Sequence, residues 1–132
     1  MTTTPHSIEA QYTLLTAVAR LDELRVRDSL AGAGSDAEAL DRAGLLELLA
    51  LSEVVAQKAA YGRQLTVRAA RESGASWSQI GAALGTSKQA AWEAHTRWID
   101  AQAAVYGQPG RLGFDEQDVA RARAVAGEPD ES

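Results

Sequence analysis

The chain has 132 residues, a mass of 14.0 kDa and a net charge of −5, which leaves room for one domain and one core. Alanine accounts for 27 residues and proline for three, and this richness in the best helix former predicts an all-α protein. Without cysteine there are no disulfides and no thiolate metal sites, and no apolar run reaches the roughly 20 residues that span a bilayer. We expect no membrane partner.

The N-terminal region predicts one long amphipathic helix. Residues 1–6 carry three threonines and a proline without apolar periodicity, and we expect them to be disordered. Apolar residues then recur at helical spacing from Ser7, a candidate N-cap, to about Leu30, and the Ala-Gly repeats of residues 31–34 end the helix. The beginning of the chain lacks the basic and apolar segments of a signal peptide, which predicts a cytoplasmic protein.

A second helix is predicted to begin at Ser35 or Asp36, with Glu38 in its first turn. Its apolar residues cover more than one face, which indicates burial on several sides. A second copy of so small a chain can supply the other wall, so residues 7–60 are predicted to pack and to dimerise. Folding back onto the same chain is the alternative. The residues expected at the dimer interface are Leu45, Leu48, Leu49, Leu51 and Val55.

The helical pattern continues over residues 61–73 and ends at Gly74, a candidate C-terminal cap. Gly62 is expected to mark a bend or a close contact with another helix. The side chains expected to face inward from this helix are those of Leu65, Val67 and Ala69.

The most informative segment is residues 74–98, which read GASWSQIGAALGTSKQAAWEAHTRW. Ser76 and Gln79 have the spacing of a capping box, which predicts a helix that starts at Trp77. Gly85 stops this helix, because glycine adopts the left-handed conformation at little cost.

A further helix follows at once, with Thr86 or Ser87 as its cap; Thr86 and Gln89 also have capping-box spacing. Two helices joined by a glycine turn of about three residues have the organisation of a helix-turn-helix. The side chains expected to lie where the two helices meet are mostly small: Ile80, Gly81, Leu84, Ala91 and Ala94.

The pieces I-G-x-x-L-G-x-S at residues 80–87 and Q-A-A at residues 89–91 resemble the helix-turn-helix of bacterial transcription regulators. They are most similar to the alanine-rich actinobacterial kind, and also to the DNA-binding end of sigma factors. The resemblance covers about residues 61–98, and Thr86 departs from it where an aliphatic residue is more common. It implies that the second helix of the motif, about residues 87–105, lies in the major groove of duplex DNA.

The charge is unevenly distributed. Residues 1–60 carry −4, residues 61–97 carry +3 and residues 98–132 carry −4. A basic region between acidic flanks favours a nucleic-acid surface, and chance clustering of a few charges is the alternative.

The outward side chains of the second motif helix have the chemistry of base readers. Lys88 can donate to guanine, Gln89 can pair with adenine, and Glu93 can accept from cytosine. The predicted base-reading residues are Ser87, Lys88, Gln89, Trp92, Glu93 and Thr96. The predicted phosphate contacts are Ser76, Ser78, Thr86, Arg63, Arg68, Arg71 and Arg97.

Each of these residues also has a structural interpretation. The charged residues can be a solvated helix face, and Glu93 can pair with Arg97 along the helix. Gln89 can be the capping partner of Thr86, and Trp92 can pack rather than read bases. Ser76 is foremost a cap. Trp77, Trp98 and Ile99 are expected in the core or at the dimer contact, and His95 at or near the surface.

The rest of the chain, residues 107–132, is expected to be a partly disordered tail. A short helix over residues 115–126 is possible within it, with Val119 and Val125 as its only apolar residues besides alanine.

Together these patterns predict a small all-α bundle, with long packing and dimerisation helices at residues 7–60 and a DNA-binding region at residues 61–106. We expect a homodimeric, sequence-specific transcriptional regulator that binds duplex DNA. We find no catalytic constellation, and expect no enzyme activity, metal or cofactor. The alternatives are a protein-interaction module, such as an antitoxin-like protein or an adaptor with a protein partner, and a phage DNA-packaging or excision factor.

Overall fold

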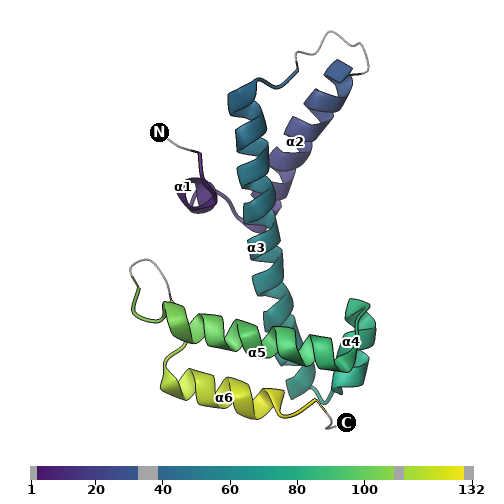
Figure 1. The fold of residues 1–132 in the computed structure, drawn as a ribbon, viewed down its shortest axis with the longest axis vertical. Coiled ribbons are helices and arrows are strands. Elements are labelled where there is room, and N and C mark those ends of the chain that lie inside the picture. Colours follow the sequence, from purple (N-terminus) through teal and green to yellow (C-terminus); the bar gives the residue numbers. More distant parts are fainter. Residues whose placement is uncertain (1–2, 33–38, 109–111, 130–132) are drawn as a thin grey trace. The chain divides into compact units, whose positions relative to one another are not determined.

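The computed structural model describes residues 3–32, 39–108 and 112–129. These residues form six helices and no strand, so the predicted all-α class is confirmed (Figure 1). The chain divides into two compact units, Met1–Tyr61 (unit 1) and Gly62–Ser132 (unit 2), each with its own hydrophobic cluster. The expectation of a single core was therefore wrong. None of the described helices is long and apolar enough to cross a membrane.

Unit 1 begins with a short helix that the sequence pattern missed, α1 (Pro5–Glu9). Thr4 is its N-cap: the Thr4 hydroxyl accepts a hydrogen bond from the Ser7 backbone N–H, and the Ser7 hydroxyl accepts one from the Thr4 N–H, both at 3.0 Å. Ser7 is thus the third helical residue rather than the cap. Residues 3–6 are ordered by this capping box, contrary to expectation, while residues 1–2 lie outside the described residues.

The predicted first helix is in fact two helices, because the chain turns after α1 and starts again at α2 (Leu14–Gly32). Thr13 and Thr16 form a second reciprocal cap. The Thr16 hydroxyl accepts from the Thr13 backbone N–H at 2.8 Å, and the Thr13 hydroxyl accepts from the Thr16 N–H at 3.2 Å. Such threonine pairs give the backbone an alternative to a continuous helix.

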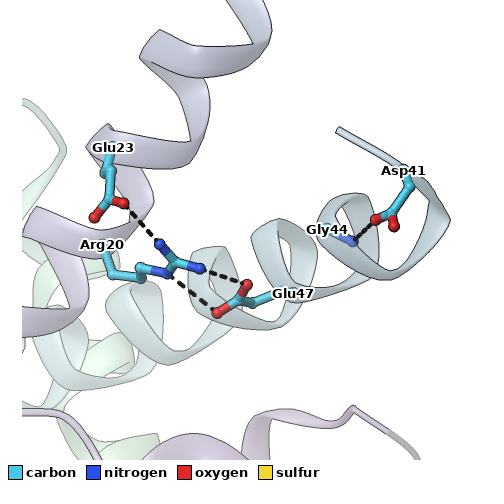
Figure 2. Close-up of polar contacts among 5 residues, drawn as sticks. All are labelled: Arg20, Glu23, Asp41, Gly44 and Glu47. Carbon is cyan, nitrogen blue, oxygen red and sulfur yellow. Dashed lines mark hydrogen bonds and ion pairs between the residues drawn. The ribbon is translucent and has the colours of Figure 1, made fainter. Parts of the chain in front are cut away.

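The long helix α3 (Arg42–Glu72) starts in unit 1. The Asp41 carboxylate accepts a hydrogen bond from the Gly44 N–H at 2.8 Å, which satisfies a donor of its first turn (Figure 2). The predicted start at Ser35 or Asp36, with Glu38 in the first turn, lies outside the described residues.

An ion pair joins the two helices of unit 1 beside a small aliphatic core. Arg20 of α2 donates to Glu47 of α3 from Nε at 3.2 Å and from Nη2 at 3.0 Å, and also pairs with Glu23 (Figure 2). This two-point contact fixes the register of α2 against α3. The buried residues beside it are Ala17, Leu24, Leu51 and Val54.

Unit 2 contains the rest of α3, which continues without interruption through Gly62. Among the described residues, and apart from the backbone of its own helix, a Cβ atom at Gly62 would meet no heavy atom within 4 Å, so the predicted close helix contact was wrong. The buried face of this segment carries Gln64 and Val67, whereas Leu65 is half-buried and Ala69 exposed. The helix ends before Gly74, whose φ of 100° makes it the predicted terminal glycine.

The remaining helices of unit 2 are α4 (Trp77–Leu84), α5 (Lys88–Val105) and α6 (Glu116–Ala126), and α5 packs against both others. The short helix predicted over residues 115–126 is confirmed as α6. Its buried residues are alanines, Ala122 and Ala126, at 2% and 1% exposure, rather than the two valines. They join a core that holds Trp77, Ile80 and Ile99 and is flanked by Phe114, Trp92 and Trp98.

Candidate nucleic-acid interface

The first motif helix, α4, is capped as predicted. The Ser76 hydroxyl accepts from the Gln79 backbone N–H at 3.1 Å, and the Gln79 side chain accepts from the Ser76 N–H at 2.9 Å. Ser76 is half-buried, which fits its role as a cap. The helix ends at Gly85, which has the left-handed conformation with φ of 71°.

The turn folds back tightly onto α4. The Thr86 backbone N–H donates to the Gly81 carbonyl at 2.8 Å. A Cβ atom at Gly81 would lie 2.8 Å from the Thr86 carbonyl oxygen and 2.9 Å from the Ser87 carbonyl carbon. Gly81 is therefore small for the predicted reason, close approach of backbones. Ile80 points into the core as expected, but Leu84 is 38% exposed.

The second motif helix, α5, is capped by Ser87, whose hydroxyl accepts from the Ala90 N–H at 3.0 Å. Of the two candidate caps, Thr86 is therefore the wrong one. Gln89 is not a capping partner either, because its side-chain Nε2 donates to the Glu93 carboxylate at 3.0 Å. Of the two alanines expected to face α4, Ala91 is buried and Ala94 is half-buried.

Most predicted base-reading side chains lie on the outward face of α5. Ser87, Lys88, Gln89 and Glu93 are exposed, whereas Thr96 is half-buried and its hydroxyl donates to the Glu93 backbone carbonyl at 3.0 Å. The predicted phosphate contacts that are exposed are Arg63, Ser78, Thr86 and Arg97.

The C-terminal end of α6 receives three hydrogen bonds on consecutive carbonyl oxygens. Each donor comes from a different helix: Arg71 Nε to Val125 at 3.2 Å, Trp77 Nε1 to Ala126 at 2.7 Å, and Trp92 Nε1 to Gly127 at 2.7 Å. We call this arrangement the carbonyl clasp. It makes the segment expected to be a tail an integral part of unit 2.

The carbonyl clasp changes two expectations. The Arg71 guanidinium also donates to the Ala75 carbonyl at 3.1 Å and lies 5.3 Å from the centre of the Trp77 ring, so it serves the fold and does not fit a phosphate contact. Trp92 is half-buried against the core, so packing describes it better than base reading. Arg68 is half-buried too, with its guanidinium over the Phe114 ring at 5.9 Å.

His95 is fully buried, contrary to expectation. Its Nδ1 donates to Gln64 Oε1 at 2.8 Å, and its ring stacks on Trp98 at 5.4 Å. Burial and the nearby Arg68 and Arg71 lower the pKa of His95 to about 4, so the ring is neutral at pH 7. A sequence signal existed, because His95 is four residues after Ala91 and four before Ile99, on the buried row.

The predicted dimer residues fall into two groups. Leu51 is fully buried in the core of its own unit, and Leu48 and Val55 are partly buried against the same cluster. Leu51 thus packs within its own chain, which is the alternative to dimerisation, and Leu48 and Val55 do so in part. Leu45 and Leu49 are 44% and 66% exposed, so they remain available to a partner.

The chain matches no known protein family, no curated protein and no solved structure.

Proposed function

We propose that the protein is a sequence-specific transcriptional regulator that binds duplex DNA as a homodimer, with the first turns of α5 in the major groove. The observation that carries the proposal is the unit formed by α4, the turn pressed on Gly81, and α5. A short helix supports a second one that begins at an exposed cap, and the first outward residues of that helix are polar. This is the arrangement that reads base edges in helix-turn-helix proteins.

The electrostatics favour two copies over one. Of the five basic residues between 61 and 97, Arg63, Lys88 and Arg97 are exposed, while Arg68 and Arg71 are half-buried. Few exposed cations mean few phosphate contacts, and affinity for DNA grows with their number. Two copies on one duplex double that number and read two half-sites about one helical turn apart.

Unit 1 supplies the surface through which we propose that two copies meet. Several large apolar side chains of unit 1 remain exposed around its small core, and apolar side chains that gather into one exposed patch mark interaction sites. The most exposed of them are Leu15 at 79%, Leu49 at 66%, Val26 at 49%, Leu30 at 48%, Leu46 at 48% and Leu45 at 44%.

The proposal is tested by selection from a pool of random duplex DNA at moderate salt, with the parent protein and Lys88→Ala side by side. We expect the parent to enrich an inverted repeat, and the exposed Lys88 side chain to be required for full enrichment. A folded parent that enriches no sequence contradicts the proposal. Equal enrichment by Lys88→Ala removes this residue from the interface.

A second candidate is a protein-interaction module, favoured by the same exposed leucines of unit 1. The two functions respond differently to salt. A protein that binds DNA releases cations from the phosphates, so added salt opposes binding and the affinity falls steeply. Binding through an apolar surface releases no such cations and does not weaken in this way.

A further inference from the structure

Gln89 and Glu93 lie one helical turn apart at the exposed beginning of α5. The Gln89 amide donates through Nε2 to Glu93 Oε1 at 3.0 Å. Both side chains thus form a single hydrogen-bonded pair on the face that the proposed function turns toward the bases.

The pair has a defined hydrogen-bonding character. A glutamine amide has two N–H groups and a carbonyl oxygen, and the bond to Glu93 engages one N–H. When Glu93 takes the N–H that lies trans to the carbonyl oxygen, the other N–H and that oxygen form a donor and an acceptor side by side. That combination matches adenine in the major groove, where N7 accepts and the N6 amino group donates.

We infer that Glu93 is a positioning residue, which orients the Gln89 amide so that α5 selects adenine. The inference rests on the proposed function, and it replaces the expectation that Glu93 itself reads cytosine. A free glutamine side chain must be ordered when it binds, at a cost in conformational entropy, whereas the Glu93 bond orders it beforehand.

The position of a carboxylate here supports a specific role. Glu93 is exposed on the helix face that approaches DNA, where a negative charge is repelled by phosphates. The second acid further along this helix, Asp100, is engaged elsewhere, since its carboxylate accepts from Arg123 at 2.7 Å. Asp100→Asn therefore provides a control that removes a negative charge from the same helix, together with the ion pair to Arg123.

The test is selection from random duplex DNA with five proteins: the parent, Gln89→Ala, Glu93→Ala, Glu93→Gln and the control Asp100→Asn. The helical circular dichroism and melting midpoint of each variant establish that it is folded. The readout is the base preference at each position of the enriched motif, which a general loss of stability does not change selectively.

We expect Gln89→Ala and Glu93→Ala to lose preference for the same adenine, by about tenfold. Glu93→Gln retains an acceptor for the Gln89 amide and keeps the preference, and so does Asp100→Asn. Both substitutions of Glu93 remove a negative charge and raise the affinity for duplex DNA of unrelated sequence, so this affinity and the adenine preference change separately.

Two results would overturn the inference while the proposed function stands. In one, Glu93→Ala keeps the adenine preference. In the other, Glu93→Ala loses preference at a cytosine and Gln89→Ala does not, which means that Glu93 reads that base directly. A folded parent that enriches no sequence overturns the proposed function and the inference together.

Discussion

The two units of this chain bury their side chains in different ways. Unit 2 encloses Trp77, His95 and Ile99 almost completely, and the side chains of Arg71, Trp77 and Trp92 donate to the carbonyl clasp. The hydrophobic cluster of unit 1 holds four buried aliphatic residues, whereas Leu15 and Leu49 of the same unit are 79% and 66% exposed. The difference supports the proposal that two copies of the chain meet through unit 1, where large apolar side chains remain exposed.

Trp77→Ala is expected to have the largest effect, because it empties the centre of unit 2 and leaves the Ala126 carbonyl without its donor. Truncation of a buried tryptophan costs about 3–5 kcal/mol of unfolding free energy. Hydrogen exchange measured residue by residue separates the two units. Amides of α4 and α5 should lose protection, while those of α2 keep it. Equal loss in α2 would show that the two units unfold as one.

Acid is expected to weaken unit 2 through His95. The pKa of His95 is about 4 in the folded chain, whereas the ordinary pKa of a histidine is 6.5, so the unfolded chain takes up the proton first as pH falls. Stability is therefore full above pH 6.5 and falls down to pH 4, by about 3 kcal/mol in total. Urea unfolding across this range measures the loss. His6→Gln replaces an exposed histidine, and this variant should still lose stability between pH 6.5 and pH 4. His95→Gln should not show this loss.

Gly81→Ala and Gly62→Ala should act in opposite directions. A methyl group at Gly81 meets backbone atoms at 2.8 and 2.9 Å, and such overpacking costs about 1–3 kcal/mol. A methyl group at Gly62 meets nothing within 4 Å inside a helix, where alanine is favoured over glycine by about 1 kcal/mol. Thermal melting compares the two. If both variants changed the melting temperature equally and in the same direction, the close contact between Gly81 and the turn would be contradicted.

Leu45→Gln combined with Leu49→Gln is expected to weaken dimerisation with little change in the helical content of unit 1. Each leucine is already about half exposed, so its burial in a dimer contributes about 1 kcal/mol. Sedimentation velocity over a range of concentrations measures the shift. Leu112→Gln replaces a leucine of unit 2 that is 91% exposed and should leave the dimer intact.

The local features of the fold were predictable because short-range signals specify them. The capping box of Ser76 and Gln79, the left-handed Gly85 and the cap at Ser87 each depend on residues within a few positions of one another. The small size of Gly81 was explained by the same local reasoning, since the turn that contacts it is only five residues away.

Long-range contacts were not predictable in the same way. Trp77 donates to a carbonyl 49 residues away and Trp92 to one 35 residues away. An alanine-rich α6 gives little indication that its backbone accepts these bonds. The mistaken placement of Arg71 has the same origin, because an arginine on a helix suggests solvent or phosphate until its carbonyl partners are known.

The most direct test of the account is the number of chains bound to one selected duplex. Sedimentation velocity of the complex at moderate salt measures its mass. The account predicts two copies of the chain on one duplex that carries an inverted repeat. A complex with a single chain, or no complex with any selected duplex, would contradict it.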